Sequence, residues 1–124
     1  MRQKRILVVE DDTDLRRMYS TALQGAGYAV DEAADGLEAL RIVEARSPDV
    51  IVLDLTLHAV DGLSVQEELA SRATTSRIPI VIVTGSDREV EALNVASLLR
   101  KPVMPDQLIE TVESCLPGVF PASA

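Results

Sequence analysis

Short runs of consecutive apolar residues alternate along the chain with longer segments in which apolar residues recur at helical spacing. The clearest runs are "ILVV", "VIVL" and "IVIV", at residues 6–9, 50–53 and 80–83. Weaker strand-like segments fall at residues 28–33 and 97–102. Strands that are apolar at every position are usually covered on both faces, and here helical segments separate them. The pattern therefore predicts a single α/β domain with a five-stranded parallel sheet.

The segments between these runs have the apolar spacing of helices that pack on a sheet. The first helix, over residues 14–27, would turn Met18, Tyr19 and Leu23 inward. The later helices are expected to bury, in chain order, Leu37, Leu40, Val43, Val65, Leu69, Leu108 and Val112. Residues 86–96 leave room for only about two turns, so the fourth helix is predicted to be shortened or irregular. We assign the domain to residues 1–117 and a flexible tail or cut linker to residues 118–124.

Composition and charge exclude several classes of function. The 124 residues are 47% hydrophobic and carry a net charge of -8. That charge argues against nucleic-acid binding, which needs clustered Lys and Arg, and we interpret Arg16 and Arg17 as solvated. No apolar run approaches the roughly 18 residues of a membrane span, and the amino terminus does not have the pattern of a signal peptide. With Cys115 as the single cysteine, we expect a soluble, cytoplasmic protein.

Polar residues whose side chains can take part in chemistry follow the predicted strands at the points where the strands end. Glu10 and Asp11 follow the first strand, and Asp54 ends the third. Thr84 ends the fourth strand and Lys101 the fifth. Parallel strands end at one edge of a sheet, where ligands of open α/β folds collect. The sequence therefore predicts one pocket that holds several carboxylates, a hydroxyl and an ammonium group. Asp12 could either cap the following helix or support the pocket.

A cluster of carboxylates needs a cation to keep it ionised. Carboxylates within a few ångströms raise one another's pKa unless positive charge lies between them. Mg²⁺ is the hard cation that prefers oxygen ligands and shares its remaining positions with phosphate oxygens. In such a pocket Asp54 could act as a nucleophile toward a phosphoryl group, with Lys101 neutralising charge and Thr84 donating a hydrogen bond.

The ordered motifs "ILVVEDD", "VIVLDL", "PIVIVTG" and "LLRKP", with "DG" at residues 61 and 62, resemble the receiver domain of two-component response regulators. The resemblance runs from Arg5 to Leu116 and implies a doubly wound (βα)5 flavodoxin-like fold of the CheY-like superfamily. It also implies that Asp54 is the phosphoacceptor, that Thr84 and Lys101 contact the phosphoryl group, and that the bond from Lys101 to Pro102 is cis. The Mg²⁺ ligands that it implies are Glu10 through water, Asp11, Asp54 and the backbone carbonyl of Thr56.

The chain departs from this family pattern at several positions. Leu98 stands where the family usually has an aromatic residue, and Asn94 stands where a glycine is common. The segment between Thr84 and Lys101 is also shorter than usual. In the loop after the phosphoacceptor, residues 57 and 58 are Leu and His in place of the usual Met and Pro. The change at residues 57 and 58 is expected to loosen that loop without touching the chemistry. Because the usual aromatic residue is absent, we expect activation to move the loop after Thr84 and the short fourth segment instead of flipping a ring.

The function expected from this resemblance is phosphorylation-controlled signalling. The domain would take a phosphoryl group from a histidine kinase or phosphotransfer protein and present a changed surface to a downstream protein target. It would catalyse its own phosphotransfer and dephosphorylation without being a conventional turnover enzyme. A haloacid dehalogenase-like phosphatase is disfavoured, because such enzymes need an Asp where this chain has Thr56. A phosphorylation-independent interaction or dimerisation module stays open, as does a homodimer.

Overall fold

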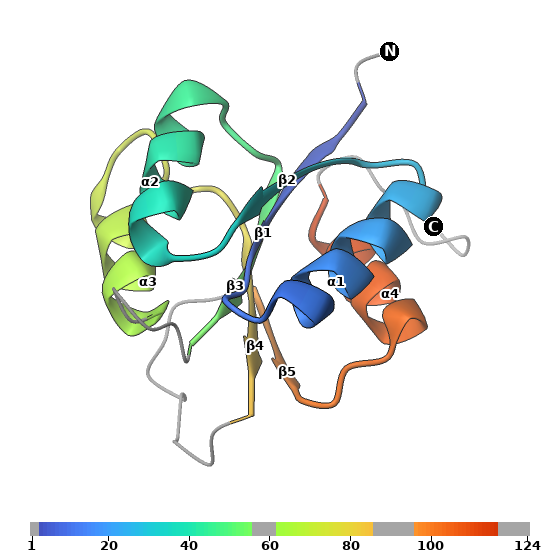
Figure 1. The fold of residues 1–124 in the computed structure, drawn as a ribbon. Helices are drawn as coiled ribbons and strands as arrows, with labels where there is room; N and C mark the ends of the chain where they lie inside the picture. Colours follow the sequence, from blue (N-terminus) through green and yellow to red (C-terminus); the bar gives the residue numbers. More distant parts are fainter. Residues whose placement is uncertain (1–2, 56–61, 86–95, 117–124) are drawn as a thin grey trace.

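The computed structural model of the 124-residue chain describes residues 3–55, 62–85 and 96–116. Its five strands form one parallel sheet with the order β2-β1-β3-β4-β5 (Figure 1). The strands are β1 (Arg5–Val9), β2 (Ala29–Ala33), β3 (Val50–Asp54), β4 (Ile80–Thr84) and β5 (Ser97–Arg100). This topology confirms the predicted α/β fold with its parallel sheet. The weaker segment at residues 28–33 contributes β2, which lies at one edge of the sheet.

Two layers of helices cover the sheet. The helices are α1 (Thr13–Gly25), α2 (Gly36–Ala45), α3 (Gly62–Ser71) and α4 (Pro105–Cys115). As Figure 1 shows, α1 and α4 lie on one face and α2 and α3 lie on the other. No helix in the described part of the chain is long and apolar enough to cross a membrane.

Helices α1 and α2 are each preceded by an aspartate that caps their first turn. Asp12 caps α1 by accepting a hydrogen bond of 2.9 Å from the backbone N–H of Leu15. Asp35 caps α2 in the same way, with a bond of 2.9 Å from the N–H of Glu38. These carboxylates satisfy amides that have no partner within the helix. After α1 the chain reverses at Gly27, whose φ of 102° favours glycine.

The central strands are apolar on both faces because each face packs against helices. Every residue of β3 and β4 is buried. Successive side chains of β1 alternate between two cores, so that Leu7 and Val9 pack toward α2 and α3. Ile6 and Val8 pack with side chains of α1 and α4. Alternating side-chain direction thus divides one apolar run between two cores.

Two of the residues expected to be inward-facing are exposed. Met18 is 38% exposed and Leu37 is 53% exposed. Met18 lies at the border of its helical stripe, where it lines an open groove beside Pro105. Leu37 lies in the first turn of α2, whereas Val43 at the other end of that helix is buried. Val65, Leu69, Leu108 and Val112 are buried as predicted.

Two predictions concern segments outside the described residues. The shortened fourth helix was predicted for residues 86–96, of which only the last is described. The flexible tail at residues 118–124 also lies outside. The expected cis peptide bond between Lys101 and Pro102 is present.

Candidate functional site

The parallel sheet brings the predicted polar residues to one edge. Asp54 is the last residue of β3 and pairs in register with Val83, one residue before the end of β4. Thr84 closes β4, and its carbonyl oxygen accepts a 2.9 Å hydrogen bond from the backbone N–H of Lys101. On the other side of β3, the N–H of Glu10 donates to the carbonyl of Ala33 at 3.1 Å. Backbone pairing therefore fixes the position from which each of these side chains starts.

Glu10, Asp11 and Asp54 form an acidic cluster at this edge. Each contributes a carboxylate oxygen, and these oxygens all lie within 4.8 Å of one another. Glu10 is 1% exposed and Asp54 is 2% exposed, whereas Asp11 is half-buried. Oxygen donors at this spacing are the ligand type that binds hard divalent cations. The cluster could therefore hold a metal ion with one side open to solvent.

Lys101 supplies positive charge to the cluster. Its Nζ donates to Glu10 Oε1 at 2.8 Å and lies 3.4 Å from Asp54 Oδ2. One ammonium cannot neutralise three ionised carboxylates, so two negative charges would remain. That remainder matches the charge of a divalent cation. Burying such a set of charges without a further cation is unfavourable.

The pKa values of Glu10 and Lys101 reflect the same excess of negative charge in the pocket. Burial raises the pKa of Glu10 to about 7, and its interaction with Asp54 adds to this effect while Lys101 opposes it. For Lys101, burial alone would lower the pKa of the ammonium. Its hydrogen bond to Glu10 and the charge of Asp54 reverse the direction, so the pKa of Lys101 is raised. Without a metal, Glu10 therefore holds a proton into the neutral range.

Two polar residues near the cluster have structural roles. Asp12, for which two roles were open, uses its carboxylate to cap α1, and it is not a member of the acidic cluster. Arg16 was interpreted as solvated, and this was wrong. Its Nη1 donates to the backbone carbonyl of Glu10 at 2.8 Å, and its Nε donates to Glu32 at 3.2 Å. Arg16 thus ties the end of β1 to the end of β2, a contact that depends on how α1 lies over the sheet.

Some expected residues of the site lie outside the described part of the chain. Thr56, whose carbonyl was expected to bind the metal, belongs to residues 56–61. His58 and Asn94, two of the departures from the family pattern, are also outside. Leu98 is described, and it is 36% exposed on the edge strand β5.

Comparison with known proteins gives consistent matches over nearly the whole chain. The Vibrio cholerae chemotaxis response regulator CheY4 superposes with a TM-score of 0.86 at 30% identity, covering 93% of this chain and all of that one. A putative response regulator from Chloroflexus aurantiacus superposes with a TM-score of 0.84 at 28% identity, covering 92% of this chain and 98% of that one. The sheet order and these superpositions establish a CheY-like, flavodoxin-like α/β fold.

Curated relatives are longer than this chain. The probable transcriptional regulator ycf27 of Porphyridium aerugineum is 36% identical over 129 residues, which cover all of this chain and 52% of that protein. Response regulator MprA of Mycobacterium tuberculosis (strain ATCC 25177 / H37Ra) is 35% identical, over 97% of this chain and 54% of that protein. The chain thus spans about half the length of these relatives. The model of the response regulator receiver domain matches residues 6–113, and the chain belongs to this family of two-component system domains.

Proposed function

We propose that the chain is a phosphorylation-controlled signalling receiver that accepts a phosphoryl group on Asp54 in the presence of Mg²⁺. The observation that carries this proposal is the position of Asp54. Its carboxylate ends a fully buried strand, lies within 4.8 Å of two further carboxylates, and has Lys101 at 3.4 Å. A carboxylate with a purely structural role would not need two further carboxylates and an ammonium group beside it. A carboxylate that acts as the nucleophile toward a doubly charged phosphoryl group needs these neighbours.

The donor set fits Mg²⁺. We assign Asp11 and Asp54 as direct ligands, Glu10 as a ligand through water, and the carbonyl of Thr56 as a further ligand. The half-buried Asp11 leaves the cluster accessible, which suits an ion that keeps several waters. When bound, Mg²⁺ would neutralise the carboxylates and the oxygens of the incoming phosphoryl group.

The proposed reaction is an in-line displacement at phosphorus. A carboxylate oxygen of Asp54 attacks the phosphorus of a phosphohistidine on a histidine kinase or phosphotransfer protein, and an O–P bond forms as the P–N bond breaks. The bonding electrons remain on the imidazole nitrogen, which takes up a proton. The product on this chain is an acyl phosphate. Lys101 turns its ammonium toward the phosphoryl oxygens and Thr84 donates its hydroxyl hydrogen to one of them.

The signal would leave the domain through a change in its surface. We propose that a downstream protein target, or a second copy of this chain, recognises the phosphorylated form. The acidic net charge of -8 favours a protein partner over a nucleic acid.

Phosphorylation by a small donor tests the proposal directly. The protein is incubated with acetyl phosphate and MgCl₂, and intact-mass spectrometry is expected to detect the gain of one phosphoryl group. Asp54→Asn should abolish the gain. Asp14→Asn, which changes an exposed aspartate in the first turn of α1, should leave it intact. A protein that gains no mass and does not bind beryllofluoride would instead be the phosphorylation-independent module.

A further inference from the structure

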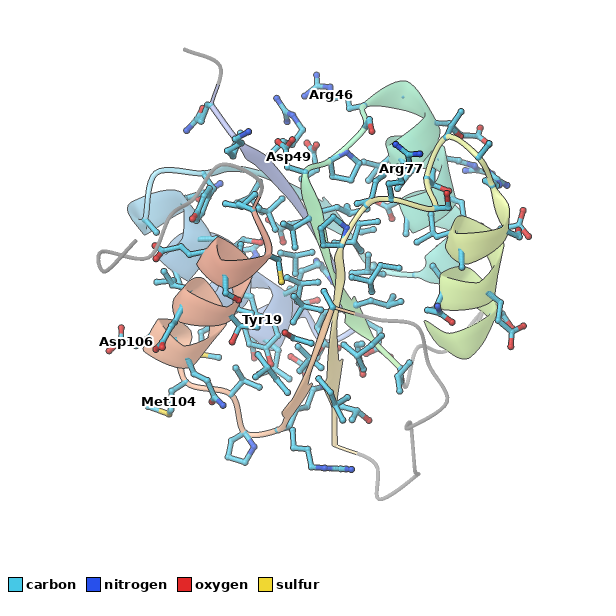
Figure 2. All side chains as sticks on the ribbon, turned by 180° about the vertical axis from the view of Figure 1, so that it is seen from behind. Tyr19, Arg46, Asp49, Arg77, Met104 and Asp106 are labelled. Atoms are coloured by element: carbon cyan, nitrogen blue, oxygen red, sulfur yellow. The ribbon has the colours of Figure 1, made fainter. Side chains whose placement is uncertain are left out.

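The side chain of Tyr19 carries a hydroxyl group that the mechanism above does not use. Tyr19 lies in α1 and is 2% exposed. Its Oη is buried and has no hydrogen-bond partner among the described residues. Figure 2 shows Tyr19 in the interior, on the side of the sheet that α4 covers. A buried hydroxyl without a partner is destabilising, and an apolar side chain would fill the same space without that cost.

The surroundings of Tyr19 connect it to Lys101. Tyr19 belongs to the same apolar cluster as Leu99 and Val103, each of which lies two residues from Lys101 in the sequence. Burial raises the pKa of Tyr19, while the charge of Lys101 lowers it and the charge of Glu10 raises it. The phenol therefore lies within electrostatic range of the charged pocket.

The hydrogen bonds of Lys101 must change when the pocket holds a metal ion and a phosphoryl group. Its Nζ now donates to Glu10 at 2.8 Å and lies 3.4 Å from Asp54. A metal ion and a phosphoryl group would both compete for these carboxylate oxygens. An ammonium has three N–H donors and no acceptor, so it needs new acceptor oxygens once the old ones are taken. The hydroxyl oxygen of Tyr19 is an acceptor with no other described partner.

We propose that Tyr19 is a positioning residue for Lys101, whose ammonium donates a hydrogen bond to the Tyr19 hydroxyl once Asp54 carries its phosphoryl group. This contact fixes the direction of the ammonium toward the phosphoryl oxygens. The inference rests on the proposed function, because it concerns the loaded state of that same pocket.

Tyr19→Phe removes the hydroxyl oxygen and keeps the ring. We expect it to lower the rate of phosphorylation by acetyl phosphate by about tenfold or more, the effect of one hydrogen bond to a charged group. Tyr28→Phe is the matched control, because Tyr28 precedes β2 at the opposite end of the sheet. Urea unfolding of the metal-free variants should show Tyr19→Phe to be at least as stable as the unmodified protein. A slower reaction would then not be due to a damaged fold.

A double-mutant cycle with Lys101→Met separates positioning from general packing. If Tyr19 acts through Lys101, Tyr19→Phe will have no further effect on the phosphorylation rate in the Lys101→Met background. Equal reductions in both backgrounds would overturn the proposal.

The chain also permits a spectroscopic test, because it contains two tyrosines and no tryptophan. In the Tyr28→Phe protein, the ¹³Cζ signal of labelled tyrosine reports on Tyr19 alone. Adding beryllofluoride and MgCl₂ is expected to shift this signal, and Lys101→Met should remove the shift. An unchanged signal in protein that binds beryllofluoride would overturn this inference while leaving the proposed function intact. If the unmodified protein neither binds beryllofluoride nor gains a phosphoryl group, the proposed function fails and this inference fails with it.

Discussion

Raising the pH of the metal-free protein from about 5 to about 8 is expected to lower its stability, because Glu10 must then ionise inside the fold. Burial, together with Asp54, raises the pKa of Glu10 from 4.5 to about 7. Between these two values the folded state binds more protons than the unfolded state. The free energy of unfolding is therefore largest below the unfolded pKa and declines until the pH passes the folded pKa.

The size of this decline follows from the two pKa values of Glu10. The interval from 4.5 to about 7, at about 1.4 kcal/mol for each pH unit, corresponds to on the order of 3 kcal/mol. A loss of that size is a large part of the stability of a typical small domain, which is about 5–15 kcal/mol.

Urea unfolding in EDTA, followed by circular dichroism, measures the effect. Glu10→Gln is the control, since the net charge of -8 also makes the rest of the protein more self-repulsive as the pH rises. The unmodified protein should lose more stability than Glu10→Gln over this range, and saturating MgCl₂ at about pH 8 should restore much of the loss. If both proteins change in parallel, the buried Glu10 does not govern the pH dependence and the reasoning is refuted.

Three further substitutions test individual contacts. Asp12→Ala removes the cap of α1 and should lower the free energy of unfolding, measured by urea unfolding, by about 1 kcal/mol. Asp14→Ala is the exposed control, and equal effects of the two substitutions would argue against the cap. Leu108→Ala truncates a fully buried side chain of α4 and should cost about 2–5 kcal/mol in the same assay; a cost below about 1 kcal/mol would contradict the packing. Arg16→Met removes the donor to the carbonyl that follows β1 and should weaken Mg²⁺ binding, measured by calorimetry, by about threefold or more. Arg17→Met should have no effect, and an unchanged affinity in both variants would show that this donor does not position the cluster.

The sheet and the placement of the cluster could be predicted from sequence because both depend on simple periodicities. An apolar run such as residues 50–53 has no polar face, so it must lie in the middle of a covered sheet. The parallel direction of the strands then brings Asp54 and Lys101 to one edge, although 47 residues separate them. No knowledge of side-chain contacts is needed for that step.

The details that were missed depend on how helices are placed over the sheet. Helical spacing indicates which side of α1 faces inward, but it does not give the width of the buried stripe, so Met18 was wrongly expected to be buried. Arginine is usually found on the surface, so the residue type of Arg16 gave no indication of a contact. Its hydrogen bond to the carbonyl of Glu10 arises from the way α1 lies over the sheet. The spacing does predict that Tyr19 is buried, but it gives no indication that its hydroxyl lacks a partner.

The long sequence separation within the pocket constrains the order in which the domain is made. The ion pair between Glu10 and Lys101 joins residues 91 positions apart, and the strand before Lys101 is the last of the sheet. A nascent chain still missing that strand has the carboxylates but lacks their ammonium partner. The proposed phosphotransfer therefore requires that β5 has joined the sheet, because that strand delivers the ammonium to the carboxylates.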